Sequence, residues 1–173
     1  MAAAAQVFTA HGIDAPLDTI AKEAGVGNAT MYRNFPTRDA ILEAVLQDRY
    51  ETLAASAKRQ FKVTPTDAAL LSWLRDFIDY AQTFRGLPEP VLATLRDDHS
   101  ALAVSCKAMR TTATRLLTRA QRDGTINSDI NATDLFTHAA GIAWATQRAP
   151  YDPQRVGRLL TTLARGLRPQ GDV

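Results

Sequence analysis

Cysteine is almost absent from this sequence, since Cys106 is the only one among 173 residues. A lone cysteine excludes an intrachain disulfide and a zinc site built on several thiolates. Long hydrophobic runs are missing as well, because no apolar stretch approaches the about 18 residues that a transmembrane helix needs. Met1–Ala5 contains no basic residue, so we expect no signal peptide. Together these absences predict a cytoplasmic protein with no membrane partner.

The sequence also lacks a strong charge of one sign. Its 20 basic and 18 acidic residues give a net charge of +2, and six basic against seven acidic residues give the first 60 positions a net charge of -1. Bulk electrostatics therefore does not predict nucleic-acid binding, and any such prediction depends on local geometry. Apolar residues make up 46% of the chain, which is ordinary for a folded globular protein.

Motifs of catalysis and metal binding are missing too. The chain contains no glycine-rich phosphate loop, no Gly-x-Ser-x-Gly and no His-Glu-x-x-His. His99 stands beside Asp97 and Asp98, but acidic and capping residues are common at the helix end expected there. We therefore expect no enzyme, no cofactor and no bound metal.

The sequence does contain residues that begin and end helices. Glycine and proline fall between segments of helical length, and no long run of alternating β-branched residues predicts a strand. Thr37 and Ser100 are placed to cap the helices that follow them. The pattern predicts an all-α fold of about nine helices, at residues 2–11, 17–24, 28–34, 38–60, 66–84, 89–97, 101–122, 132–148 and 153–167.

The stretch Leu17–Phe35 carries the functional signal. Two helices too short to stand alone are joined by a tight turn, which is the plan of a helix-turn-helix. The spacing places Ile20 and Ala24 inward, and Ala21 is small where the second helix crosses the first. Gly25 ends the first helix, where a positive φ costs glycine little.

The second of these helices has one face left free. Met31 and Phe35 anchor it, so its other face carries polar side chains that a major groove could receive. The residues on that face are Asn28, Thr30, Tyr32 and Arg33.

Taken together, these motifs resemble the DNA-binding domain of the TetR family of bacterial transcriptional regulators. The resemblance is weaker at Asp123–Ile126 and Gly166–Pro169. It implies that residues 1–46 form a helix-turn-helix DNA-binding domain and residues 47–173 a ligand-binding and dimerisation domain. The matching pieces are Ala4-x-x-Val7-Phe8 with Gly12, Ile20-Ala21, Ala24-Gly25-Val26, Thr30-Met31-Tyr32, Phe35-Pro36 and Arg38-x-x-Ile41-Leu42.

The resemblance also implies roles for single residues. Thr30, Tyr32 and Arg38 correspond to phosphate contacts, while Asn28, Ala29 and Arg33 stand where the family reads bases. The alternative for Arg33 is a solvated surface arginine without a role in DNA binding. The alternative for Tyr32 is a residue that packs against the protein. The DNA-binding set that we expect is Lys22, Gly27, Asn28, Ala29, Thr30, Tyr32, Arg33 and Arg38, with Gly27 at the capping position where serine or threonine is usual.

The last two predicted helices have the composition of a dimer interface. Helix 132–148 contains a run of small residues, and helix 153–167 has a leucine stripe. Two such helices from each chain make a four-helix interface, as the family does, although both could instead pack inside one monomer. The small residues are Ala139, Ala140, Gly141 and Ala143.

An aromatic stripe in helix 66–84 is the candidate effector site. Its residues follow one another at helical spacing, which suits plain core packing as well as a ligand site. The family resemblance favours a pocket for an unidentified small molecule here. No charged residue is clearly directed inward, so we expect that molecule to be uncharged or weakly polar. The expected ligand-binding set is Trp73, Phe77, Tyr80 and Phe84, with Cys106, Met109 and Trp144 closing around them.

The sequence thus predicts a homodimeric repressor that a small molecule releases from its double-stranded DNA operator. The alternative is a helical ligand-binding or protein-interaction module without DNA binding. The net charge of the first 60 residues keeps that alternative open, as does the missing basic arm that family members carry before their first helix. A steep loss of operator affinity with salt would separate the two.

Overall fold

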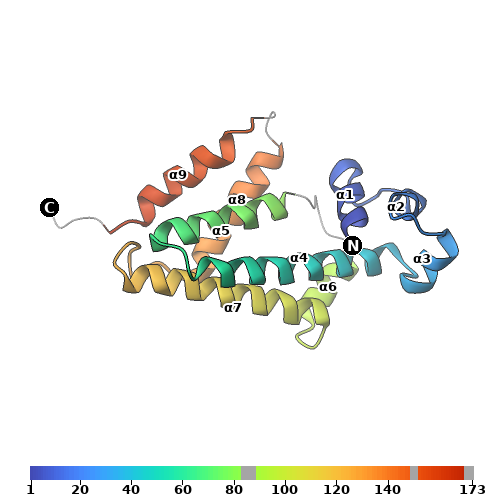
Figure 1. Ribbon diagram of the computed structural model, residues 1–173, viewed down its shortest axis with the longest axis horizontal. Helices are drawn as coiled ribbons and strands as arrows, with labels where there is room; N and C mark the ends of the chain where they lie inside the picture. The colour runs from blue at the N-terminus through green and yellow to red at the C-terminus, as the bar shows by residue number, and fades with distance from the viewer. Residues whose placement is uncertain (83–88, 149–151, 170–173) are drawn as a thin grey trace. The chain divides into compact units, whose positions relative to one another are not determined.

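The computed structural model describes residues 1–82, 89–148 and 152–169, and over these residues the chain forms nine α-helices and no strand (Figure 1). The predicted all-α fold is therefore confirmed. No helix in the described part of the chain is long and apolar enough to cross a bilayer. The helices are α1 (Ala2–His11), α2 (Leu17–Glu23), α3 (Asn28–Asn34), α4 (Arg38–Gln60), α5 (Thr66–Ala81), α6 (Glu89–Arg96), α7 (Ala101–Arg122), α8 (Ala132–Arg148) and α9 (Arg155–Leu167).

Both predicted caps are present. The Thr37 hydroxyl accepts the amide of Ala40 at 3.1 Å, and the Ser100 hydroxyl accepts the amide of Ala103 at 3.0 Å. Each bond pairs an amide that the first turn of a helix leaves without a partner. The predicted bounds agree with the observed helices to within three residues at every described end.

The largest difference is in α5, which ends at Ala81, three residues before the predicted end. Two smaller differences lie where side chains form turns. Helix α9 begins two residues later than predicted, because the Asp152 carboxylate accepts the amide of Gln154 and holds a turn there. Helix α6 ends one residue earlier, where the Asp97 carboxylate accepts the amide of His99. Short polar side chains often compete with the helix in this way. Positions 83 and 84 of the predicted helix 66–84 lie outside the described residues.

The chain divides into two compact units, neither of which is one continuous stretch. The first unit comprises Met1–Thr52 and Thr83–Ala108, and the second comprises Leu53–Gln82 and Met109–Val173. Helices α4 and α7 each contribute residues to both. The functional boundary predicted at residue 46 stays a prediction, since compactness follows packing rather than function.

The first unit is built around one hydrophobic cluster. Phe8 of α1 and Leu42 of α4 are completely buried in it, and Ile20 and Met31 bring α2 and α3 to the same cluster. Val91 of α6, also completely buried, belongs to it as well, together with Leu102 of α7. The helix-turn-helix thus shares its core with α6 and α7.

In the second unit, α5, α8 and α9 contact one another pairwise. Helix α9 buries Leu160, Ala164 and Leu167, which recur at the spacing of one helical face. The amide of Asn127 donates to the carbonyl of Leu167 at 2.8 Å and fixes the end of α9 against the loop before α8. The Gln121 side chain donates to the carbonyls of Asn127, Ser128 and Ile130 and holds that loop.

Candidate functional site

The turn between α2 and α3 has the geometry that its sequence predicts. Gly25 has a φ of +66°, a conformation that residues with a Cβ rarely adopt. The amide of Val26 reaches back to the carbonyl of Ala21 at 3.0 Å, and Ala21 is 1% exposed where the two helices pack. A larger side chain at residue 21 would force the helices apart.

The inward-facing residues of this motif are partly as predicted. Ile20 and Met31 are buried, and Phe35 is half-buried against the same core. Ala24, however, is exposed, so its predicted inward orientation was wrong. Ala24 is the C-cap of α2, where the chain already turns away from the core.

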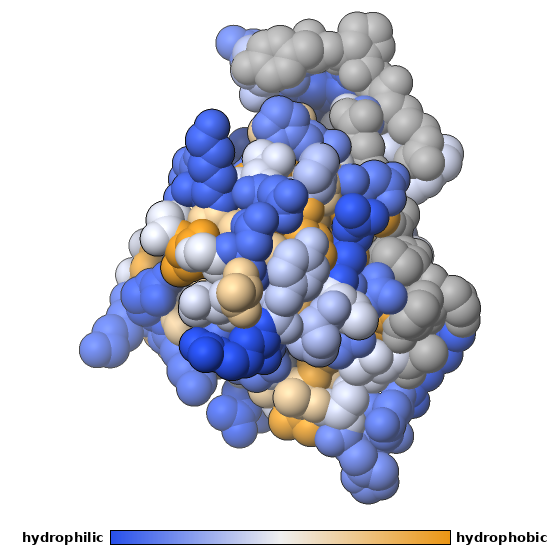
Figure 2. Space-filling view, turned by 90° about the vertical axis from the view of Figure 1, so that its right-hand side faces the viewer, coloured by the Kyte–Doolittle hydropathy of each residue, from blue (hydrophilic) through white to orange (hydrophobic). Residues whose placement is uncertain are grey.

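The predicted DNA-reading face of α3 is open to solvent. All five of its candidate residues are exposed, and Tyr32 alone exposes 45% of its surface. Figure 2 looks at the side of the molecule that carries α2 and α3, and its surface is mainly hydrophilic with small hydrophobic spots. This arrangement presents polar side chains outward while one face of α3 stays anchored. The exposed residues are Asn28, Ala29, Thr30, Tyr32 and Arg33.

Gly27 supplies the N-cap of α3 through its backbone alone. Its φ of -69° and ψ of 146° are extended, and its carbonyl accepts the amides of Thr30 and Met31. No side chain caps the helix at this position. The Asn34 side chain donates to the carbonyl of Thr30 at 2.8 Å, so it stabilises the last turn of α3.

The two remaining candidates for DNA contacts, Lys22 and Arg38, differ in their exposure and in their contacts with the protein. Lys22 is exposed on α2. Arg38 is half-buried, and its Nη2 donates to the carbonyl of Ala15 at 3.2 Å while its Nη1 lies 3.8 Å from the carboxylate of Asp14. Arg38 therefore ties the start of α4 to the segment between α1 and α2, a role that the sequence did not indicate.

Helices α6 and α7 meet α4 within the first unit. The Thr94 hydroxyl of α6 donates to the Glu43 carboxylate of α4 at 2.7 Å. The Ser100 hydroxyl donates to the carbonyl of Thr94, which connects the start of α7 to the same point. Ser105 of α7 donates to the Glu51 carboxylate at 3.3 Å. Any displacement of α6 or α7 thus acts on the helix that follows the helix-turn-helix.

The half-buried phenol of Tyr50 lies beside these contacts. The Tyr50 side chain is hydrogen-bonded with the Cys106 thiol, and burial raises the pKa of Tyr50 above its usual range, with the Cys106 sulfur adding to the effect. Cys106 is half-buried and belongs to the first unit. It therefore packs on a tyrosine of α4.

The aromatic stripe of α5 forms a packed cluster. The Trp73 and Phe77 rings stack with centroids 5.7 Å apart, and both contact Phe136 of α8. Trp73 is fully buried, and its indole N–H donates to the carbonyl of Leu53 at 2.9 Å. The guanidinium of Arg110 lies 5.4 Å from the Phe136 ring centroid. These contacts give Trp73 the environment of a core residue.

The other predicted ligand contacts lie in different environments. Met109 is buried and Tyr80 is half-buried, whereas Trp144 exposes 61% of its surface. Phe84 lies outside the described residues. The effector role of this set stays a prediction.

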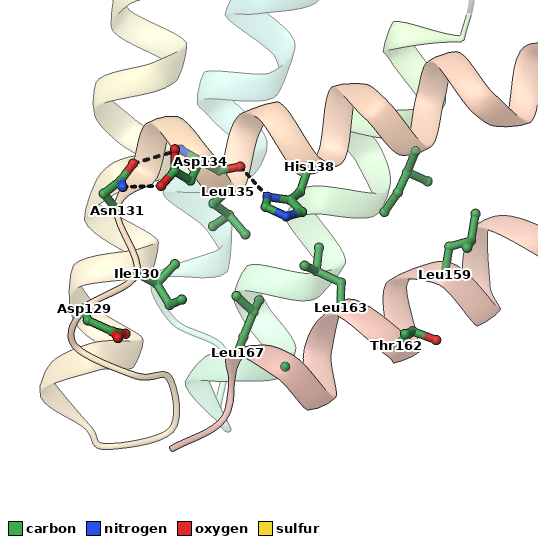
Figure 3. A pocket seen from close by; sticks show the side chains of 12 residues that line it. Asp129, Ile130, Asn131, Asp134, Leu135, His138, Leu159, Thr162, Leu163 and Leu167 are labelled. Atoms are coloured by element: carbon green, nitrogen blue, oxygen red, sulfur yellow. Dashed lines mark hydrogen bonds between the residues drawn. The ribbon is translucent and has the colours of Figure 1, made fainter. Parts of the chain in front are cut away.

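A groove that the sequence did not indicate runs between α8 and α9 (Figure 3). It encloses about 530 Å³, and in Figure 3 the side chains of Leu135, Leu163 and Leu167 lie in the space between the two helices. One end is polar, where the His138 ring donates to the carbonyl of Asp134 at 2.8 Å. Asp129, Ile130, Asn131, Ile142, Leu159, Thr162 and Gly166 complete the lining.

The small residues of α8 divide between two faces. Ala139 and Ala143 are buried within the monomer, while Ala140 and Gly141 are exposed. Residues four apart share a helix face, so this division follows directly from helical geometry. The predicted run of small residues therefore serves internal packing on one face and leaves the other open.

Two family models match the chain. The family described as "Bacterial regulatory proteins, tetR family" matches residues 1–45, and "Transcriptional regulator SbtR-like, C-terminal domain" matches residues 65–169. A comparison with curated protein sequences gives no match.

Several solved structures resemble the whole chain. A TetR transcriptional regulator from Streptomyces coelicolor is 38% identical over 98% of this chain and 97% of its own, with a TM-score of 0.78. A TetR regulatory protein from Mycobacterium vanbaalenii is 27% identical over 97% of this chain and 92% of its own, with a TM-score of 0.66. The TetR-like regulator LfrR from Mycobacterium smegmatis, solved with proflavine, shares the fold at 23% identity over 98% and 94% of the two chains, with a TM-score of 0.65.

Proposed function

Because the chain belongs to the TetR family of bacterial transcriptional regulators, we propose that it is a repressor that a small molecule releases from its double-stranded DNA operator. As a member of this family, the chain is a DNA-binding regulator and not an enzyme. We further propose that it acts as a homodimer in the cytoplasm.

The exposed face of α3 is the observation that carries this proposal. Asn28 and Arg33 stand free of the core while Met31 anchors the helix from the opposite side. An arginine presented in this way suits guanine, and an asparagine suits adenine, through two hydrogen bonds each. Thr30 and Tyr32 are available for phosphate oxygens, which position the protein without reading sequence.

The dimer proposal rests on the groove between α8 and α9 and on the exposed face of α8 beside it. The groove has an apolar floor, and Trp144 exposes a large hydrophobic surface on α8. Exposed aromatic residues are frequent anchors of protein interfaces. A second copy of the chain would cover these surfaces, as the two-fold symmetry of an operator requires.

The contacts of α6 and α7 with α4 support the release mechanism. An effector held among α5, α7 and α8 would shift these helices, and the Ser105–Glu51 hydrogen bond would pass a shift of α7 to α4. A dimer must hold its recognition helices about 34–36 Å apart to reach successive major grooves. A coupling of about 1–3 kcal/mol would lower DNA affinity about 5–150-fold.

The effector that we propose is small and mostly apolar. The aromatic cluster of Trp73, Phe77 and Phe136 lies among the helices concerned. LfrR, which shares this fold, was solved in complex with proflavine, an aromatic molecule. A screen would seek a compound that both raises the melting temperature and dissociates the operator.

Operator binding tests the proposal. An operator is selected from a random duplex library, and its dissociation constant is measured at 50 and 200 mM salt for the wild type, Arg33→Ala and Tyr32→Phe. We expect a steep fall of affinity with salt. Arg33→Ala should cost about 1–3 kcal/mol and relax the preference at one base pair, whereas Tyr32→Phe should weaken binding to all sequences alike.

The matched control is Arg122→Ala, because Arg122 is an exposed arginine on α7. It should leave operator affinity unchanged. An equal effect of Arg33→Ala on selected and random DNA would make Arg33 a backbone contact. Absence of salt-dependent binding would favour the module without DNA binding.

A further inference from the structure

A hollow lined by arginines lies on the flank of α9 that faces α5. It encloses about 600 Å³, and three guanidinium groups from the two helices line it. Arg75 comes from α5, and Arg158 and Arg165 come from α9. Gln154, the N-cap of α9, and Arg158, Thr161 and Arg165 follow one another at intervals of four, three and four, which places them along one flank of the helix. Gly157 lies beside Arg158 on this flank.

Gly157 lets the two helices share this hollow. A Cβ atom built on Gly157 would lie 3.0 Å from Nη2 of Arg75, so the guanidinium of Arg75 rests against the backbone of α9. A Cβ at residue 157 would press on the end of Arg75, which would have to give way by a few tenths of an ångström. The absence of a Cβ thus brings a cation from α5 to the arginine flank of α9.

The carboxylates nearby balance only part of this positive charge, since Asp152 pairs with Arg155 and Arg158, and Asp79 interacts with Arg75. Among the described residues, the ion pairs of this region join Arg155 and Arg158 to Asp152, and Arg75 and Arg165 take part in none of them. Arg75 acts electrostatically on Asp79, one turn along α5. Cations gathered without matching carboxylates repel one another unless an anion joins them.

The hydroxyl groups of the hollow already use their hydrogens. Thr161 donates to the carbonyl of Gly157 at 2.8 Å, and Thr162 donates to the carbonyl of Arg158 at 3.1 Å. The available donors are therefore the guanidinium groups of Arg75 and Arg165, the N–H groups of Arg158 that do not bind Asp152, and the side-chain amide of Gln154. Guanidinium groups match the paired oxygens of phosphate and carboxylate groups.

We propose that this hollow binds a small ligand carrying several phosphate or carboxylate groups, held by Arg75 and Arg165 with Arg158 at the rim. This site is separate from the helix-turn-helix and from the groove between α8 and α9, with which it shares only Thr162 as a lining residue. A second copy seated on the groove and a ligand in the hollow would approach opposite flanks of α9.

Binding of inorganic pyrophosphate and of citrate to the full chain without DNA tests the proposal. Isothermal titration at constant ionic strength should give saturable binding of at least one of the two. Tighter binding of pyrophosphate would identify phosphate as the preferred group, and tighter binding of citrate would identify carboxylate. The double variant Arg75→Gln with Arg165→Gln should raise the dissociation constant at least tenfold.

Two further variants separate a built site from general attraction. Arg115→Gln with Arg122→Gln removes the same charge from exposed positions of α7 and should change the dissociation constant less than twofold. Gly157→Leu keeps the charge but fills the space in which the end of Arg75 rests, and should weaken binding several-fold. Circular dichroism checks that each variant is folded.

The outcomes are distinguishable from those of operator binding. Arg33→Ala should leave anion binding unchanged, because it alters only the face proposed to read DNA. Absence of saturable binding by either probe would overturn the proposal. An equal loss in the α7 control, or unchanged binding in Gly157→Leu, would overturn it as well.

Discussion

At the scale of single residues, the guanidinium of Arg38 contacts the protein's own backbone, although the family resemblance implies a phosphate contact at this position. It donates to the carbonyl of Ala15 and lies near Asp14, whose side chain is 95% exposed. Its Nε atom is buried and has no partner among the described residues. We therefore expect Arg38 to stabilise the fold whether or not DNA is bound.

Arg38→Ala should lower the free energy of unfolding by about 1–2 kcal/mol, because it removes a charge-assisted hydrogen bond to a backbone carbonyl. Urea unfolding measures the change. Arg33→Ala is the control, since Arg33 is exposed and its loss should alter stability by less than about 0.5 kcal/mol. Equal stability of the two variants would argue against a structural role for Arg38.

The half-buried side chain of Tyr50 leads to a second prediction, which concerns how the free energy of unfolding depends on pH. Burial raises the pKa of Tyr50 in the folded protein above the ordinary value of 10.0. Its contribution to stability is therefore fully present below pH 10 and falls as the pH rises further, by up to about 1.4 kcal/mol per pH unit. Tyr50→Phe should remove this part of the alkaline decline.

Urea unfolding at several values between pH 8 and pH 11 tests the prediction for Tyr50. Tyr32→Phe is the matched control, because Tyr32 is exposed on α3. It should follow the wild-type curve. Parallel curves for Tyr50→Phe and the wild type would mean that Tyr50 ionises normally in the folded state.

At the scale of helices, residues that act on their near neighbours in sequence predicted nearly all of the helix ends and turns. The caps at Thr37 and Ser100 and the positive φ of Gly25 follow from chemistry within a few residues, and the structure confirms them. Contacts between distant segments left no such signal. The burial of Val91 in the core of the helix-turn-helix unit could not be predicted, because periodicity identifies a buried face but not its partner.

The candidate site divides in the same way. The exposed face of α3 follows from helical spacing, so its residues could be predicted once Met31 was taken as the anchor. The α8–α9 groove and the contact of Arg75 with Gly157 depend on how helices from different parts of the chain pack. Sequence spacing within one helix does not encode that packing.

The Thr37 cap allows a test at the same scale. Thr37→Ala should destabilise the protein by about 1 kcal/mol, because the amide of Ala40 loses its acceptor. Thr37→Asp should retain most of the stability, since an aspartate side chain can also accept the amide hydrogen bond at the start of the helix. Its negative charge also interacts favourably with the positive end of the helix dipole. Thermal unfolding measures both, with Thr111→Ala at an exposed position of α7 as the control. Equal losses for the alanine and aspartate variants would exclude capping as the cause.

At the scale of the whole molecule, the state of association is the central prediction. Ala140 is exposed on α8 and Leu163 lines the groove, so a charge at either position would be buried by a partner chain. Ala140→Glu and Leu163→Glu should convert a dimer to monomers, because an unpaired buried charge is costly. Sedimentation equilibrium measures the mass, with Ala55→Glu on the exposed side of α4 as the control. An unchanged dimer in both variants would place the interface elsewhere.

The interleaving of the two compact units limits how such a regulator can be rebuilt. Residues 1–46 look like a cassette that could be exchanged between relatives to change operator specificity. Their core, however, is completed by Val91 and Leu102, which arrive from a later stretch of the chain. A chimera cut after residue 46 would join a foreign helix-turn-helix to α6 and α7 surfaces shaped for another core. Successful exchange therefore needs residues 83–108 to be transferred together with the helix-turn-helix.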